Sequence, residues 1–517
     1  MTLLWLLACA ECPEGFEEID DNCYPAAEEE EEVEVEGVPL EAPALLRRTS
    51  LDLLGVLPSE EDLRRVDEQP EALEELQLAL LGDPRLEGRL VEVLGARWHT
   101  LVDDFDIQAR EVGLEEYPYE RSVGEEPLRL MARIGVEDRP WTDILRADFT
   151  MANESLESIW PLEREGPGWS VAHYVDGRPP AGVLATNGFF WRYQTTRSNA
   201  NRGRAAALAR LLVCDDLSAR PVTFEALTGS TGDALKESPV CISCHVTLEP
   251  MASSLFGWYW VEAHNPLEAG AYHPEREPMG EALLGVTGGW YGQPVDGLGP
   301  LGEAIAADPR FDRCQTSAFA EAFFRTDVRA LQHYETLSGL TADWQDEGLR
   351  LIPLLGELVT HPLYAVAPTQ PLAADQLASM VEDLTGFSWW SEGFDLMRSD
   401  TYGYRVMAGG VDGRFVLKAG QDPSLTYALV VKRLSEAAAA YAVEQGTFFT
   451  VAEVQTSPED PAFAEQIDAW SWRLVAADGD VEGLAALWWA VEANAGAEEA
   501  WAAVISAVLR DQDLVMY

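Results

Sequence analysis

The stretch SPVCISCHVTLEPM, residues 238–251, places two cysteines and a histidine within five residues of a chain that has seven of each. Cys241 and Cys244 are three residues apart and would face one side of a helical turn, and His245 follows directly. Cys-x-x-Cys-His is the pattern of covalent haem attachment, because each thiol can form a thioether with the macrocycle and the imidazole can bind the iron. The motif predicts one haem c, held by Cys241 and Cys244 with His245 as proximal ligand.

Two other kinds of site use the same residue types. A zinc site needs four ligands and usually a second paired motif, whereas Cys214 and Cys314 stand singly in the sequence. A Cys241–Cys244 disulfide would leave His245 without a role, and the strand–helix context of thioredoxin-like motifs is absent. Both alternatives stay open beside the haem interpretation.

The second axial position of the iron has several candidates. Met251, in Leu-Glu-Pro-Met, is the first choice as a thioether ligand, followed by Met279, His264 and His273. A methionine at such a place also commonly fills a core. An open position would allow a small ligand to bind.

The N-terminus predicts export. Residues 1–9, MTLLWLLAC, are apolar and end in Leu-Leu-Ala-Cys, which resembles the site where a bacterial signal peptide is cut and the cysteine is lipidated. This stretch lacks a basic leading region, so a merely apolar N-terminus is the alternative. We expect a signal peptide over residues 1–8, a lipidated Cys9, and a membrane-anchored lipoprotein in the periplasm or on the outer cell surface. No other run approaches the roughly 18 apolar residues of a membrane span.

The segment after Cys9 suits a tether in an oxidising compartment. Cys12 and Cys23 bracket a short loop and are expected to form a disulfide. The run EEEEEVEVEG, residues 28–37, repels itself and predicts a flexible linker. Once these cysteines have been assigned, Cys214 and Cys314 remain, and we expect them to pair, with buried free thiols as the alternative.

The charge excludes some partners. The chain has 89 acidic and 36 basic residues and a net charge of −53, which repels nucleic-acid phosphates and anionic lipid headgroups. We therefore expect no nucleic-acid partner, membrane attachment only through lipid, and a redox partner that the sequence does not name.

Helical periodicity predicts a mainly α, multi-helical fold with irregular inserts and short β segments. Breaks are expected at residues 55–58 and 82–84, with Ser59 as a helix N-cap, and residues 161–200 predict loops with at most short strands. The expected divisions are a lipidated N-terminus, Cys loop and acidic linker at 9–42, a helical domain at 43–160, a loop-rich haem-binding domain at 161–330 and a C-terminal helical domain at 331–517.

Several segments in order resemble the planctomycete-type cytochrome c-like proteins, large exported bacterial proteins of unassigned role. These segments are RRTSLDLLGVLPSEEDLRRV, RSNANRGRAAALARLLVCDDL, CISCHVTLEPM and DPRFDRCQTSAFAEAFF, and the likeness covers about residues 43–365. The resemblance implies haem attachment at Cys241 and Cys244 and iron binding by His245. It also aligns Arg202-Gly203 with the Arg-Gly that opens the helix before the family's motif. Relatives read closer to His-x-x-Met, so the methionine here stands further from the histidine.

Electron transfer or another redox role is the first expectation, and two other classes remain. A haem-assisted or hydrolytic enzyme of polymer degradation could use carboxylates such as Asp103, Asp104, Asp106 and Glu154, although in so acidic a chain these predict a solvated face. A haem-free surface binding protein could use some of the 17 tryptophans, although Trp389-Trp390 and Trp488-Trp489 are expected in helix cores. The Gly-Gly-Val-Asp-Gly run, residues 409–413, predicts a tight turn with positive φ.

Overall fold

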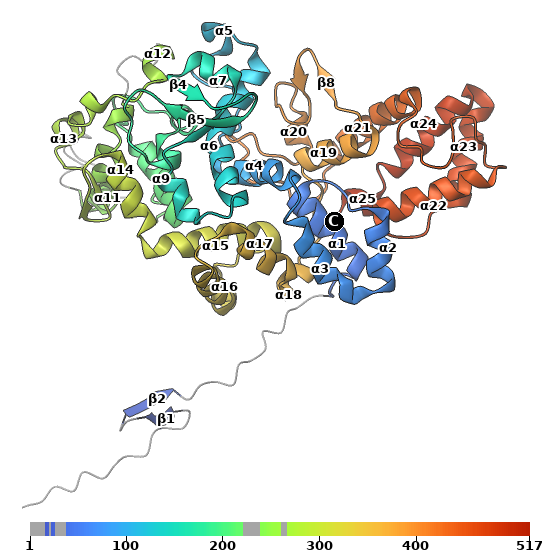
Figure 1. Cartoon of the computed structure of the whole chain (residues 1–517), viewed down its shortest axis with the longest axis horizontal. Coiled ribbons are helices and arrows are strands. Elements are labelled where there is room, and N and C mark those ends of the chain that lie inside the picture. The colour runs from blue at the N-terminus through green and yellow to red at the C-terminus, as the bar shows by residue number, and fades with distance from the viewer. Residues whose placement is uncertain (1–15, 20–21, 26–37, 221–237, 260–265) are drawn as a thin grey trace, which may run out of the picture.

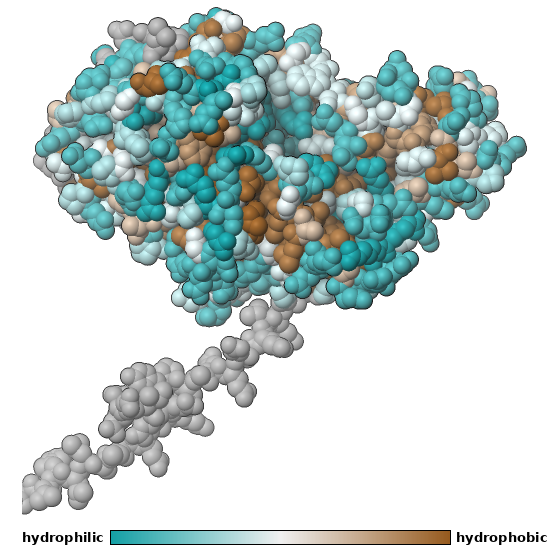
Figure 2. Space-filling model, viewed as in Figure 1, coloured by the Kyte–Doolittle hydropathy of each residue, from teal (hydrophilic) through white to brown (hydrophobic). Residues whose placement is uncertain are grey.

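The structure is a computed structural model and describes residues 16–19, 22–25, 38–220, 238–259 and 266–517. The mainly α fold expected from the sequence is confirmed, with helices throughout and only short strands (Figure 1). Two hydrophobic cores divide the body into a first lobe, the described part of residues 38–365, and a second lobe, residues 370–517. On the face seen in Figure 2 most of the surface is hydrophilic, and hydrophobic residues gather near the middle of this face.

The helices of the first lobe are α1 (Ala42–Leu54), α2 (Glu60–Glu68), α3 (Leu73–Leu80), α4 (Arg85–Trp98), α5 (Ala109–Val112), α6 (Glu116–Val136), α7 (Glu154–Ile159), α8 (Asn187–Arg192), α9 (Arg202–Val213), α11 (Pro239–Ser253), α12 (Pro266–Ala269), α13 (Met279–Leu284), α14 (Leu298–Ala306), α15 (Pro309–Phe324), α16 (Tyr334–Asp346), α17 (Leu351–Thr360) and α18 (Pro362–Ala365). Those of the second lobe are α19 (Ala374–Thr385), α20 (Tyr404–Met407), α21 (Leu425–Gln445), α22 (Pro461–Val475), α23 (Val481–Ala495), α24 (Ala497–Val508) and α25 (Gln512–Val515). Short 3₁₀ segments are η1 (Pro70–Ala72), η2 (Trp141–Leu145), η3 (Gly182–Ala185), η4 (Phe256–Trp258), η5 (Pro274–Arg276) and η6 (Leu331–His333).

The strands form small antiparallel pairings. β5 (Ser170–Tyr174) lies between β3 (Thr150–Ala152) and β4 (Leu162–Arg164), with Thr150 opposite Ala172 and Leu162 opposite Tyr174. Three hairpins join β1 (Phe16–Ile19) to β2 (Asn22–Pro25), β6 (Gly289–Trp290) to β7 (Gln293–Pro294), and β8 (Trp390–Ser391) to β9 (Phe394–Asp395). The few strands expected within residues 161–200 are therefore present.

Local sequence signals account for several helix ends. Gly55 ends α1 in the left-handed conformation, with φ of 71°. Ser59 caps α2 by accepting a hydrogen bond from the backbone N–H of Asp62, at 3.1 Å. Residues 82–84 separate α3 from α4, as expected.

The first lobe has one large core that runs from Leu45 to Tyr364. Residues of the expected 43–160 and 161–330 domains share this core, and α15, α16 and α17 add to it. The second core gathers residues 372–517 together with Leu51 and Leu57 at the N-terminal end of the first lobe. Helix α1 therefore contributes to both cores.

The expected signal peptide, Cys9, Cys12 and the acidic run lie outside the described residues. Within β1 and β2, Cys23 is paired through the backbone register with Glu18. Of the helices that the structure describes, none combines the length and apolar character needed to cross a membrane.

Candidate functional site

The Cys-x-x-Cys-His motif lies in α11, an ordered helix rather than a loop. Pro239 occupies the first turn, where a missing N–H costs nothing, and Ser238 is the N-cap residue. Cys241, Cys244 and His245 then fall within the first two turns. The sequence predicted a loop-rich surrounding segment, and the structure shows that the motif itself is helical because no glycine or further proline interrupts it before Pro250.

The two motif cysteines are free, half-buried thiols. Helical spacing places residues three apart on one face, so both thiols belong to the same side of α11. The Cys244 thiol lies 3.7 Å from the backbone oxygen of Leu217, which follows α9 in the chain. The motif is thus packed against the end of α9 while both sulfurs remain partly accessible.

His245 has a defined hydrogen-bond partner. Its Nδ1 lies 2.7 Å from Oε1 of Glu249, one helical turn further along α11. Glu249 in turn receives two hydrogen bonds from Arg202 at the start of α9, at 2.7 and 3.0 Å. A carboxylate that accepts from one ring nitrogen fixes the tautomer and leaves Nε2 with its lone pair for a metal.

The first turns of α11 expose apolar side chains. Val246 is 65% exposed and Ile242 37% exposed, and no residue from Pro239 to Pro250 is buried. Burial begins at Met251, followed by Ala252 and Ser253. One end of α11 is thus anchored in the core, while the end that carries the motif presents uncovered hydrophobic surface.

Two of the residues expected as a second iron ligand, Met251 and His273, are engaged elsewhere in the structure. Met251 is 1% exposed and belongs to the main core of the first lobe, on the same helix as His245. Both ring nitrogens of His273 are engaged, Nδ1 with Glu275 at 2.9 Å and Nε2 with the backbone oxygen of Glu268 at 3.1 Å. Met279 is half-buried at the start of α13, and His264 lies outside the described residues.

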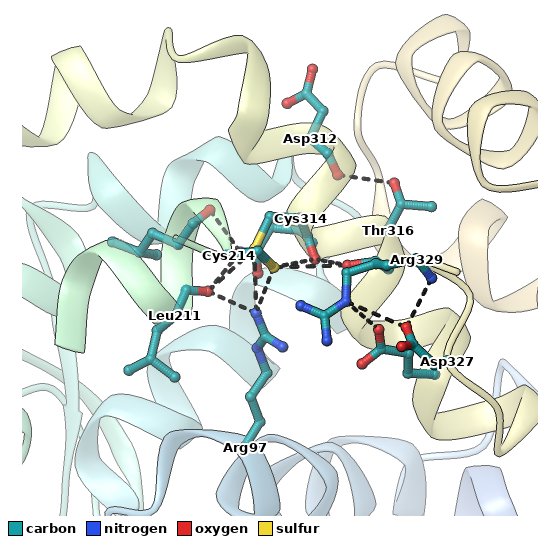
Figure 3. Close-up of a disulfide and its surroundings, with 12 residues drawn as sticks. Arg97, Leu211, Cys214, Asp312, Cys314, Thr316, Asp327 and Arg329 are labelled. Carbon is teal, nitrogen blue, oxygen red and sulfur yellow. Dashed lines mark hydrogen bonds and ion pairs between the residues drawn. A yellow bond between two sulfur atoms is a disulfide. The ribbon is translucent and has the colours of Figure 1, made fainter. Parts of the chain in front are cut away.

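Cys214 and Cys314 form a disulfide, with Cα atoms 5.3 Å apart (Figure 3). Cys214 ends α9 in the left-handed conformation and Cys314 lies within α15, so the bond joins these two helices. The guanidinium of Arg97 in α4 lies over the bond and donates to the Leu211 backbone oxygen at 3.0 Å. Burial lowers the pKa of Arg97 to about 10.

The structure also places the other residues that the sequence singled out. Asp103 accepts from Ser399 Oγ at 3.0 Å and from the backbone of Asp400, and Asp104 pairs with Arg414 at 3.2 Å. These carboxylates join the two lobes. Glu154 is paired with Arg164 at 3.0 Å on the surface.

The turn at residues 409–413 has positive φ at Gly409 and Gly413, as predicted. The expected helix-core placement of Trp389-Trp390 is wrong, because Trp390 begins β8 and is 53% exposed. In the second pair Trp488 is buried within α23, whereas Trp489 is 41% exposed.

Across the described ranges, which omit residues 1–15, 20–21, 26–37, 221–237 and 260–265, no three His, Cys, Asp or Glu side chains come together as a metal site. A zinc centre with four protein ligands is therefore not assembled in that part of the chain. No family model matches the chain, and no curated protein or solved structure is significantly similar to it. The family resemblance of the sequence stays a prediction.

Glu249 is the residue of this site that sequence reasoning missed. A glutamate four positions after a histidine on a helix shares its face, so the spacing was a usable signal. Its second partner, Arg202, is 47 positions away in the chain, and only the resemblance drew attention to it.

Proposed function

We propose that this chain is an exported c-type cytochrome-like protein that binds one covalent haem on α11 and takes part in electron transfer or related redox chemistry. Cys241 and Cys244 would hold the haem through thioethers, and His245 would bind its iron. The proposal includes a signal peptide at residues 1–8 and a lipid anchor on Cys9, which would hold the protein at the membrane surface.

One observation carries the proposal. Two free thiols and an imidazole whose Nδ1 is taken by Glu249 share the end of α11 at which Val246 and Ile242 are uncovered. A disulfide or a zinc site gives no reason for leaving apolar side chains exposed beside the motif. If a macrocycle covered these side chains, the burial would contribute a stabilising free energy of about 25 cal/mol per Å² of apolar surface.

The residues present fit the group. Covalent attachment requires two thiols on one face of the helix, and iron binding requires one neutral imidazole with a free ring nitrogen. Glu249, itself held by Arg202, would hold the imidazole in orientation.

The test is production in a host with haem c maturation, followed by a pyridine haemochrome spectrum and haem staining after denaturing electrophoresis. Wild type should stain. Cys241→Ala should keep a single thioether to Cys244, with a shifted haemochrome band and lower yield, whereas His245→Ala should give little holoprotein with an altered spin state.

His173→Ala is the matched control, because His173 is exposed on β5 and lies in a different part of the first lobe. It should stain like wild type. Absence of Soret absorbance from matured wild type, with His245→Ala changing only thiol reactivity or bound zinc, would overturn the proposal.

A further inference from the structure

A cleft of about 680 Å³ opens between the lobes, and none of its lining residues belongs to α11. Helices α4 and α6 form its first-lobe wall, and α19 with the β8–β9 hairpin forms the other; Figure 1 shows β8 at the junction of the lobes. Its volume falls within the roughly 300–1,000 Å³ of small-molecule sites, which favour such interfaces. The haem proposal leaves this cleft without a role.

The polar wall of the cleft is a chain of ion pairs on α4 and α6. Arg121 contacts Glu125 at 2.6 Å and Glu92 at 3.2 Å, and Arg129 contacts the other oxygen of Glu125 at 2.6 Å. These side chains are partly buried rather than spread into solvent, with Arg121 14% exposed. Hydrogen-bond donors and acceptors therefore alternate along this wall in fixed positions.

The second lobe completes the polar lining. Arg398 pairs with Asp395 at 2.9 Å and donates to Ser379 Oγ at 2.8 Å. Arg89 of α4 pairs with Asp375 of α19 across the junction. The lining contains five arginines, namely Arg85, Arg89, Arg121, Arg129 and Arg398, and four carboxylates, namely Glu92, Glu125, Asp375 and Asp395. Charge is nearly balanced here, in a chain whose net charge is −53.

Aromatic rings stand in the same cleft. Trp390, the first residue of β8, is 53% exposed and meets the ring of Tyr117 edge-on, with 5.3 Å between centroids. Trp169 lies beneath Arg129, whose guanidinium carbon is 4.4 Å from the ring centroid. An exposed indole in a cleft leaves apolar surface in contact with water. A ligand that covers the indole would gain the free energy of burying that surface.

We propose that this interlobe cleft binds an uncharged oligosaccharide. Sugar hydroxyls both donate and accept, which matches alternating guanidinium and carboxylate groups, and the C–H faces of pyranose rings pack on aromatic side chains. An anionic ligand is disfavoured, because each lining arginine already has a carboxylate partner and the field of the whole chain repels negative charge.

The test is titration calorimetry of the full chain with neutral cello-, xylo-, malto- and manno-oligosaccharides and with oligogalacturonate as the charged arm. At least one neutral series should bind, with an affinity that changes little between low and high salt. Trp390→Ala should weaken binding by about tenfold or more, as expected for a central aromatic contact, and Trp390→Phe should retain most of it.

Trp489→Ala is the matched control, since Trp489 is a similarly exposed indole that does not line the cleft. It should bind like wild type. Two outcomes would each overturn the proposal: no neutral oligosaccharide binds, whether or not oligogalacturonate does, or Trp390→Ala binds as tightly as Trp489→Ala. Haem is not involved in any of them, so this test is independent of the proposed redox function.

Discussion

At the scale of single residues, the imidazole of His245 is hydrogen-bonded to the Glu249 carboxylate, and in the proposed haem site this contact would influence the electron density at the iron. Glu249→Gln removes a negative charge and a strong acceptor from Nδ1, which makes the imidazole a poorer donor. If the haem proposal holds, the midpoint potential should rise, by on the order of 60 mV for each tenfold change in relative ferric stability. Spectroelectrochemical titration of the matured variant measures this shift.

Glu436→Gln provides the comparison, because Glu436 is an exposed carboxylate on α21 that pairs with Lys432 at 3.1 Å, away from α11. Its potential should match wild type. A Glu249→Gln potential equal to or below that of Glu436→Gln would show that the carboxylate does not act on the iron.

A second residue, Glu126, should make stability depend on pH. Burial raises the pKa of its carboxyl to about 7, although it accepts from Tyr174 Oη at 2.6 Å and from the Gly188 N–H at 2.7 Å. Between about pH 4.5 and 7 the folded state therefore binds more protons here than the unfolded state. The stability associated with Glu126 should fall by about 3 kcal/mol as pH rises through this window.

Glu126→Gln removes this titration and can still hydrogen-bond to Tyr174 and Gly188. Urea unfolding at pH 5 and pH 7 should show a smaller loss of stability in the variant than in wild type. An unchanged difference between the two pH values would mean that Glu126 stays ionised in the folded protein.

At the scale of elements, the Cys214–Cys314 bond connects α9 to α15 and closes a loop with a sequence separation of 100 residues. In the chain-entropy model a loop of that length stabilises the folded state by about 4–5 kcal/mol. Replacing both cysteines by serine should lower the free energy of unfolding by that order, measured by urea denaturation of protein made without haem maturation.

Cys241→Ser serves as the matched control, because it removes a half-buried thiol that makes no cross-link. Its stability should stay close to that of wild type. Intact-mass measurement after alkylation without reductant checks the bond directly, and alkylation at both Cys214 and Cys314 would contradict it.

Some of the helix ends could be predicted from the sequence, whereas the surroundings of Trp390 and the interlobe cleft could not. Gly55, Ser59 and the residues 82–84 gave correct helix ends because capping and turn formation depend on neighbours in the chain. The Cys-x-x-Cys-His motif is likewise visible in the local sequence. Trp390 was misplaced because its surroundings come from Tyr117, which is far away in the sequence. The cleft has no local signal at all, since α4, α6, α19 and β8 build it only after folding.

At the scale of the whole molecule, one buried polar cluster joins the lobes. Asp52 of α1 accepts from Tyr364 Oη at 2.9 Å and from Tyr517 Oη at 2.7 Å, and it pairs with Arg325 at 3.3 Å. Tyr517 also accepts from Gln376 of α19 at 2.6 Å. Since α1 contributes to both cores, this cluster connects residues of the two lobes through a shared helix.

Tyr517→Phe should therefore weaken the junction without disturbing either core. Tyr517 is 4% exposed, and losing its hydroxyl removes one donor to Asp52 and one acceptor for Gln376, at a cost of about 1–3 kcal/mol. Urea denaturation should show this loss, and amide exchange should accelerate in α1 and α19 together.

The control is Tyr402→Phe, which removes an exposed hydroxyl bonded to Glu392 at 2.8 Å and should change stability by less than about 0.5 kcal/mol. Equal losses in the two variants, or faster exchange confined to the second lobe, would mean that the cluster does not couple the lobes.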